Sequence, residues 1–163
     1  MGKHTLEIEY DYDFVLIGIS SHEKDYRLCW MMNNKLGLEL AKANSLEIKG
    51  KKQDTPSFFS LFTYENPEAF MEYAVIANWS ESKSLVINED SLFDADKIKD
   101  RNHSENEWLI PEHKQMNYFF IIKGEIEEKE INEIIKKIKE LDVVQTGIRI
   151  DATQLKSKQN IIF

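Results

Sequence analysis

Apolar and acidic residues alternate strictly over residues 6–14, near the start of the chain. A period of two puts the apolar side chains on one face of a strand and the acidic ones on the other, so the stretch predicts a strand with one solvent-facing side. The apolar run FVLIGIS then occupies residues 14–20. We expect the strand to continue into the interior there, or to bend.

A helix is predicted over residues 22–36. Ser20 and Glu23 have the spacing of a capping box, which often opens a helix. Apolar residues then fall on one face at helical intervals until Gly37 ends the pattern, namely Cys29, Met32 and Leu36.

The middle of the chain favours strands and one long loop. A short strand is expected within residues 45–49, and the aromatic run SFFSLFTY predicts another over residues 57–64. Residues 66–78 are ambiguous, because Asn66-Pro67-Glu68 is typical of a helix start whereas residues 73–76 are typical of a strand; we favour a hairpin. Residues 80–107 are polar with few apolar anchors and predict a loop.

The last third of the chain predicts a strand-helix-strand unit. YFFIIK at residues 118–123 predicts a strand that Gly124 ends, and VVQTGIRID at residues 143–151 predicts another. Between them an amphipathic helix is indicated by the spacing of Ile131, Ile134, Ile135, Ile138 and Leu141. The connection is long enough to place the two strands parallel. We therefore expect one α+β domain over residues 1–163, with a mixed, largely antiparallel sheet, two main helices and this C-terminal unit.

Composition and charge narrow the classes of function. The chain is 42% hydrophobic and 11% aromatic, as globular domains are, and no stretch approaches the ~20 apolar residues of a membrane span. Its net charge of -8 opposes nonspecific attraction to phosphate backbones, so nucleic acid is not an expected partner. A single cysteine, Cys29, excludes an intrachain disulfide. The start of the chain carries charges where a secretory signal needs an apolar core. Together these features predict a cytoplasmic protein.

The stretch IPEHKQMNY, residues 110–118, carries a family resemblance. It is similar to the I-P-E-x-x-x-V-D-Y motif of an uncharacterised family from Bacteroidota, with matches at Ile110, Pro111, Glu112 and Tyr118. Met116 and Asn117 replace the Val and Asp of that motif, so a mechanism needing an ionised Asp at residue 117 would fail here. The resemblance extends over most of the chain and implies no assigned activity.

Two readings of the motif are open. Pro111 lacks an amide proton and favours an extended conformation at Ile110, which suits an irregular lead-in to the following strand. In one reading Glu112 accepts hydrogen bonds from nearby backbone and Tyr118 places its ring in the core; in the other they face a ligand at the mouth of a sheet. We favour the first. His113 is expected on the surface of this loop.

Other reactive residues give weak signals. The four histidines are scattered without the spacing of a metal site, so we expect no metal and no cofactor. Arg27 follows Tyr26 and could hold an anion, but Asp25 is a nearer partner. His22 occupies the position where the elbow of a hydrolase needs glycine. Cys29 lies among large apolar residues, which is typical of an inert core thiol.

The chain ends in Ile161-Ile162-Phe163, which is too apolar to be left in water without a reason. We expect it to close the core as a final strand, or to dock on a second subunit or another protein. The leading hypothesis is a small binding or interaction module that is not an enzyme, with a protein partner or a homodimer. The alternative is a hydrolase or ligand-dependent enzyme with a pocket between the first helix and the strand at 118, formed by Glu112, His113, Tyr118, His22 and Arg27.

Overall fold

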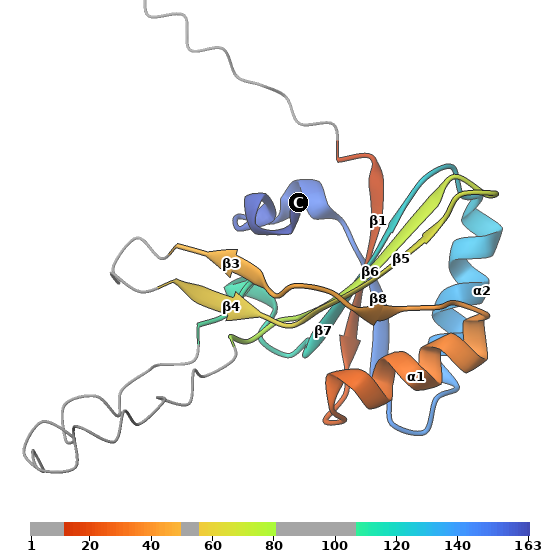
Figure 1. Cartoon of the computed structure of the whole chain (residues 1–163), viewed down its shortest axis with the longest axis horizontal. Helices are drawn as coiled ribbons and strands as arrows, with labels where there is room; N and C mark the ends of the chain where they lie inside the picture. The colour runs from red at the N-terminus through yellow and green to blue at the C-terminus, as the bar shows by residue number, and fades with distance from the viewer. Residues whose placement is uncertain (1–11, 50–55, 81–106) are drawn as a thin grey trace, which may run out of the picture.

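The computed structural model describes residues 12–49, 56–80 and 107–163. A six-stranded sheet has the order β2-β5-β6-β7-β1-β8, and a separate two-stranded sheet pairs β3 with β4 (Figure 1). The strands are β1 (Phe14–Ser20), β2 (Ala41–Lys42), β3 (Leu46–Ile48), β4 (Ser57–Phe59), β5 (Leu61–Asn66), β6 (Met71–Ala77), β7 (Tyr118–Lys123) and β8 (Thr146–Ile150).

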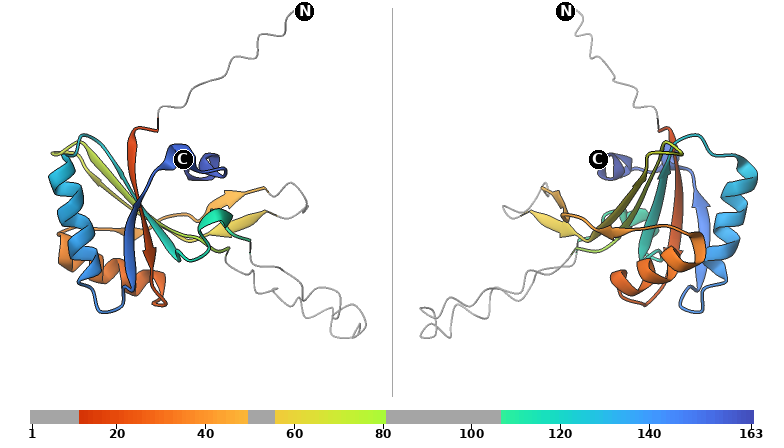
Figure 2. Two further views of the ribbon diagram at one scale, coloured as in Figure 1. Left: turned by 180° about the vertical axis from the view of Figure 1, so that it is seen from behind. Right: turned by 45° about the vertical axis from the view of Figure 1, so that its right-hand side comes forward.

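Two α-helices pack on the same side of the six-stranded sheet (Figure 2). They are α1 (Asp25–Leu36) and α2 (Glu128–Lys139), and three short 3-10 turns are η2 (Pro111–His113), η3 (Ala152–Gln154) and η4 (Lys158–Ile161). We call this side of the sheet the helix face. A mostly antiparallel sheet with two helices confirms the predicted α+β class.

The predicted strand-helix-strand unit is present as β7, α2 and β8. Both β7 and β8 pair antiparallel with β1, which lies between them, so the two strands run parallel to each other. The crossover through α2 is therefore confirmed, with β1 inserted into the middle of the unit. The second strand, Thr146–Ile150, is shorter than the predicted residues 143–151.

The first helix begins later than predicted, and the capping box assigned to it was wrong. Lys24 is the N-cap, without a side-chain bond. Ser20 is instead the last residue of β1, and its hydroxyl donates to Gln145 Oε1 at 3.1 Å. The strand continues as far as Ser20, so a connecting turn has to precede the helix. Gly37 ends the helix as expected, in a left-handed conformation with φ 69° that glycine adopts without strain.

The middle of the chain forms two separate strands where one was predicted. Ser60 breaks the aromatic run, so β4 pairs with β3 and β5 joins the main sheet. The hairpin favoured for residues 66–78 is confirmed by the β5–β6 ladder. Its turn contains Phe70, which has a positive φ of 53°. Among the residues that the structure describes, no other residue except glycine has a positive φ.

The sheet is covered on both faces. On the helix face, β1, β6 and β7 pack against apolar residues of α1 and α2, which include Leu28, Met32, Ile131 and Ile138. On the opposite side, which we call the loop face, the cover is formed by irregular segments, 3-10 turns and the β3–β4 pair; it includes Phe59, Leu109, Ile110, Met116, Leu155 and Ile161. The sheet therefore has one core covered by helices and another covered by loops, turns and a small second sheet.

Some predictions fall outside the described residues. These are the alternating strand before residue 12 and most of the predicted loop over residues 80–107. The C-terminal segment is described, and it is not a final strand: η4 forms a 3-10 turn that buries Ile161. Ile161 reaches the loop-face core from this turn. Among the described residues, no helix is long and apolar enough to cross a membrane.

Candidate functional site

The motif segment before β7 is organised by Asn78, which is fully buried. Its side-chain amide donates to the carbonyls of His113 at 3.0 Å and Met116 at 2.9 Å, while its Oδ1 accepts the Ile110 N–H at 2.8 Å. The Asn78 backbone also bonds to Leu109 and Asn117. One buried amide therefore bonds to three backbone groups of an irregular segment, of which the His113 carbonyl also accepts the Met116 N–H at 3.0 Å.

Glu112 ties this segment to the C-terminal turns. Its carboxylate accepts the Ser157 N–H at 2.8 Å and the Ser157 hydroxyl at 3.1 Å. Burial raises the pKa of Glu112, but the hydrogen bonds from Ser157 outweigh it and hold the pKa below its ordinary value. Glu112 thus accepts backbone and hydroxyl donors, in the manner of the first reading of the motif.

Tyr118 and Asn117 join the motif to the turn before α1. The Tyr118 ring is buried on the helix face, and its hydroxyl donates to the Glu23 carbonyl at 2.5 Å. Burial, with the negative charge of Asp25, raises the Tyr118 pKa well above its ordinary value. Asn117 Oδ1 accepts the Ser21 N–H at 2.8 Å, a role that an aspartate could also perform.

A hollow of about 360 Å³ lies beside β8 on the loop face. Ile148 and Ile150 of β8 line it together with Glu112 and His113 of the motif. The C-terminal segment from Gln154 to Lys156 lines another side. This hollow brings Glu112 and His113 together, while the Glu112 carboxylate is engaged by Ser157.

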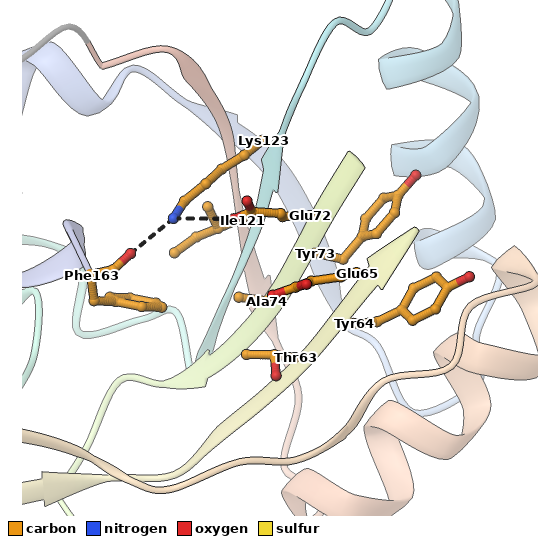
Figure 3. Close-up of a pocket in the computed structure, with 9 residues that line it drawn as sticks. All are labelled: Thr63, Tyr64, Glu65, Glu72, Tyr73, Ala74, Ile121, Lys123 and Phe163. Carbon is orange, nitrogen blue, oxygen red and sulfur yellow. Dashed lines mark hydrogen bonds and ion pairs between the residues drawn. The ribbon is translucent and has the colours of Figure 1, made fainter. Parts of the chain in front are cut away.

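A smaller hollow of about 190 Å³ lies on the loop face beside Phe163 (Figure 3). Lys123 donates to the backbone oxygen of Phe163 at 2.9 Å and pairs with Glu72 at 3.7 Å. Its ammonium group also lies 5.5 Å from the centre of the Phe163 ring. Lys123 therefore holds the end of the described chain against the sheet, and its charge is already compensated there.

A polar cluster lies where α1 meets the β2–β5 edge of the sheet. The buried Ser60 hydroxyl bonds to both Asp25 and Lys42, and Lys42 also pairs with Asp25 at 3.5 Å. Burial raises the pKa of Asp25, but bonds from Ser60 and the Tyr26 N–H, with the charge of Lys42, leave it below its ordinary value. Because its pKa is lowered, the Asp25 carboxylate is a weak base and is poorly suited to take a proton from Ser60.

Cys29 faces the core below this cluster. Burial, with the charge of Asp25, raises its pKa from 9.0 to about 12. The thiol is therefore protonated near neutral pH, in agreement with the inert role expected for it.

The outer surface of α1 presents large aromatic side chains to solvent. Trp30 is 65% exposed and Tyr26 is 60% exposed. One helical turn separates the two residues, so they are neighbours on the helix surface. Arg27 lies beside them, and its guanidinium pairs with Glu23 at 3.5 Å while remaining largely exposed. Trp, Tyr and Arg are the residue types that dominate binding energy at protein interfaces.

The structure disperses most of the residues predicted from sequence. Glu112 and His113 line the hollow beside β8, and Phe163 lines the other hollow. Tyr118 is buried beneath α1, while His22 and Arg27 are exposed at its N-terminal end. Neither hollow combines the five residues of the enzyme alternative. In the described part of the chain, no group of three metal-ligating side chains converges.

Two sets of residues were missed by the sequence interpretation. Asn78 carried no signal, because a buried amide looks like any polar residue after a strand. Tyr26 and Trp30 did carry one: both are large aromatic residues that fall off the apolar stripe of Cys29, Met32 and Leu36, where polar residues are the rule.

Comparison with protein-family models, with curated proteins and with solved structures found no match to this chain. A function is therefore proposed from the geometry of the surfaces and hollows described above.

Proposed function

We propose that this protein is a non-enzymatic protein-interaction module whose contact surface is the outer side of α1, formed by Tyr26, Arg27 and Trp30. The observation that carries the proposal is the exposure of two large aromatic rings one turn apart, 60% for Tyr26 and 65% for Trp30. We call these three residues the α1 surface.

The fold itself gives no reason for aromatic residues at these positions. Tyr and Trp are poorer helix formers than Lys, Gln or Arg, and neither ring is packed into the helix-face core. Exposing them forgoes the ~1.5–3 kcal/mol that burial of a large apolar side chain can contribute. A partner that covers both rings would recover that free energy.

The surroundings of the α1 surface indicate the chemistry of the partner. A helix is convex, so its partner should offer an apolar groove, as in other helix-in-groove complexes. Lys24 and Arg27 are exposed beside the aromatic pair, although the chain as a whole has a net charge of -8. Charge complementarity favours a groove rimmed by carboxylates. The proposed partner is therefore a protein with an acidic-rimmed apolar groove.

Other exposed apolar residues make weaker candidates. Phe70 is 87% exposed but stands at the tip of a hairpin without a second large aromatic beside it in the described sequence. Phe163 is held by Lys123 against the sheet. The α1 surface combines two aromatic anchors with a cation on a regular element, which is the arrangement of an interface hot spot.

We also propose a compartment and a family for this module. We place the module in the cytoplasm, where its lone buried Cys29 would stay reduced. Membership of the family named for its I-P-E motif is also proposed, on the matches at Ile110, Pro111, Glu112 and Tyr118. The buried thiol of Cys29 and the engaged hydroxyl of Ser60 favour binding over catalysis.

The test is an affinity measurement with a partner captured by the intact chain, then purified. Trp30→Gln keeps a helix-forming residue and should weaken the dissociation constant about 30-fold, the effect of a hot-spot residue worth about 2 kcal/mol. Phe70→Asn removes an exposed aromatic ring elsewhere and is the matched control; it should bind like the parent. Equal affinity of parent and Trp30→Gln would overturn the proposal.

Binding should also be visible at Trp30 itself. Its exposed indole is open to acrylamide, which quenches tryptophan fluorescence on contact. We expect the purified partner to protect the fluorescence of the parent chain, and to protect that of Trp30→Gln much less. Protection that does not depend on Trp30 would place the interface elsewhere.

A further inference from the structure

We infer that a second copy of this chain binds along β8, so that the two sheets join edge to edge about a two-fold axis near Ile148. This inference does not rest on the α1 surface, because it concerns a different element. The partner is the chain itself, and the reasons lie in β8 and in α2 beside it.

The first reason is the open edge of the sheet. β8 is the last strand in the sheet order and pairs with β1 alone among the described strands (Figure 1). In an antiparallel ladder, every second residue directs its N–H and C=O away from the neighbouring strand. The outer edge of β8 therefore presents backbone donors and acceptors that an added strand can pair with.

The second reason is that β8 lacks the usual protection of an edge strand. Its sequence, TGIRI, contains no proline and no lysine. Its one charged side chain, Arg149, is bonded to Glu128 of α2 at 2.6 Å. Ile148 meanwhile is 37% exposed. An exposed apolar residue on an unprotected edge is a feature of strands that pair with another chain.

The third reason is that β8 is complementary to itself. Ile150 belongs to the loop-face core and Gly147 lies against Ile138 of α2, so Ile148 faces the loop side and Arg149 the helix side. With the axis at Ile148, each Ile148 packs against the partner's Ile148. Arg149 then lies opposite the partner's Gly147, which leaves room for the guanidinium group.

The fourth reason is the charge pattern of α2. Glu128 lies near Arg149 and Lys139 near Gly147, so α2 runs antiparallel to β8. At 100° per residue the flank of α2 on this side consists of Glu128, Asn132, Lys136 and Lys139. A two-fold axis places the acidic end of this flank beside the basic end of its copy, with Glu128 near the partner's Lys139 and the partner's Lys136.

The mass of the intact protein in solution, measured over a range of concentrations by light scattering, tests the inference. We expect the parent chain to approach twice its monomer mass as concentration rises. Ile148→Lys places two like charges on the axis and should weaken the dimer at least tenfold. Gln159→Lys adds the same charge at an exposed residue outside β8 and should leave the dimer unchanged.

Two results would overturn the inference. One is a parent chain that stays monomeric at every concentration. The other is a dimer that Ile148→Lys and Gln159→Lys affect equally. Circular dichroism of each variant establishes that it is folded before its mass is compared. Neither result bears on the α1 surface, so a failure here leaves the proposed function standing.

A charge swap tests the orientation of α2. The helix dipole also favours acidic residues at the start of a helix and basic ones at its end, but it gives no preference among partners. Lys136→Glu and Glu128→Lys should each weaken self-association through like-charge contacts. Mixed together, they should form heterodimers in excess of random mixing, seen by native mass spectrometry. Random mixing would contradict the proposed orientation.

Discussion

The motif segment and the outer surface of α1 use their distinctive residues in opposite ways. Asn78, which directly follows β6, and Glu112 of the motif segment both form hydrogen bonds with backbone groups of this same chain. On α1, Tyr26 and Trp30 contribute little to the interior and face solvent. The family motif therefore contributes to the fold. The surface suited to binding lies on α1, a helix that carries no sequence motif.

This contrast has a physical basis. An irregular segment that covers a sheet face must satisfy its own buried backbone groups, and that requirement selects specific side chains such as Asn78. A regular helix satisfies its backbone internally, so its outer residues are free to vary. Residues that bind a partner from such a surface are therefore not required for the fold.

Replacing Asn78 by alanine tests the structural half of this contrast, and we expect the largest effect there. The change leaves the Ile110 N–H and the Met116 carbonyl without the amide that bonds to them. It also removes one of two donors from the His113 carbonyl, which keeps its bond from the Met116 N–H. We expect a loss of about 3–5 kcal/mol in the free energy of unfolding, measured by urea denaturation.

Asn44→Ala is the control for that variant, since Asn44 is exposed in a connecting segment. It should change the free energy of unfolding by less than about 0.5 kcal/mol. Similar effects of the two variants would show that the Asn78 network does not organise the motif segment.

The pH dependence of the free energy of unfolding tests whether the buried Cys29 thiol has a raised pKa. Cys29 ionises in the unfolded chain above its ordinary pKa of 9.0, whereas in the folded chain its pKa is about 12. The unfolded state therefore binds fewer protons between these values, and stability is lost as pH rises through this window. We expect Cys29 to contribute a slope approaching about 1.4 kcal/mol per pH unit midway between the two pKa values.

Cys29→Ala removes the titrating group, so its stability should fall less steeply over that window, although the smaller side chain lowers stability at every pH. Urea denaturation of both chains at matched pH values gives the two slopes. Parallel slopes would mean that Cys29 is not held protonated in the folded state.

Glu112→Gln should have a smaller effect. The amide oxygen can still accept one bond from Ser157, but the charge is lost, so we expect about 0.5–1.5 kcal/mol less stability at neutral pH. Because the folded pKa of Glu112 is lowered, the parent should lose this contribution as pH falls through the carboxyl range. Below that range the two chains should converge. A constant difference down to acidic pH would contradict the charged interaction.

Periodicity predicted most of the regular elements because side chains in the core have to match the repeat of a helix or strand. The helix containing Ile131 and Ile138 and the strand before Gly124 were placed from this pattern. The start of α1 was not, because Ser20 and Glu23 have cap spacing while the strand extends to Ser20. The local sequence pattern could not show whether Ser20 belongs to the strand β1 or to the start of the helix α1.

Candidate site residues were harder to place because they depend on contacts distant in sequence. The partner of Glu112 is Ser157, which the motif gives no means to find. The end of the chain was expected to close the core as a final strand or to dock on another subunit or protein; Ile161 instead reaches the core from a 3-10 turn. The proximity of Glu112 and His113 to β8 likewise depends on the sheet order, which periodicity does not determine.

The decisive comparison is the affinity of one purified partner for Trp30→Gln and for Glu112→Gln. Neither change should unfold the protein, and each alters one of the two contrasted regions. We expect Trp30→Gln to weaken binding about 30-fold and Glu112→Gln to bind within about twofold of the parent. The reverse result, with binding lost in Glu112→Gln and kept in Trp30→Gln, would show that the motif segment is the interaction site and that this account is wrong.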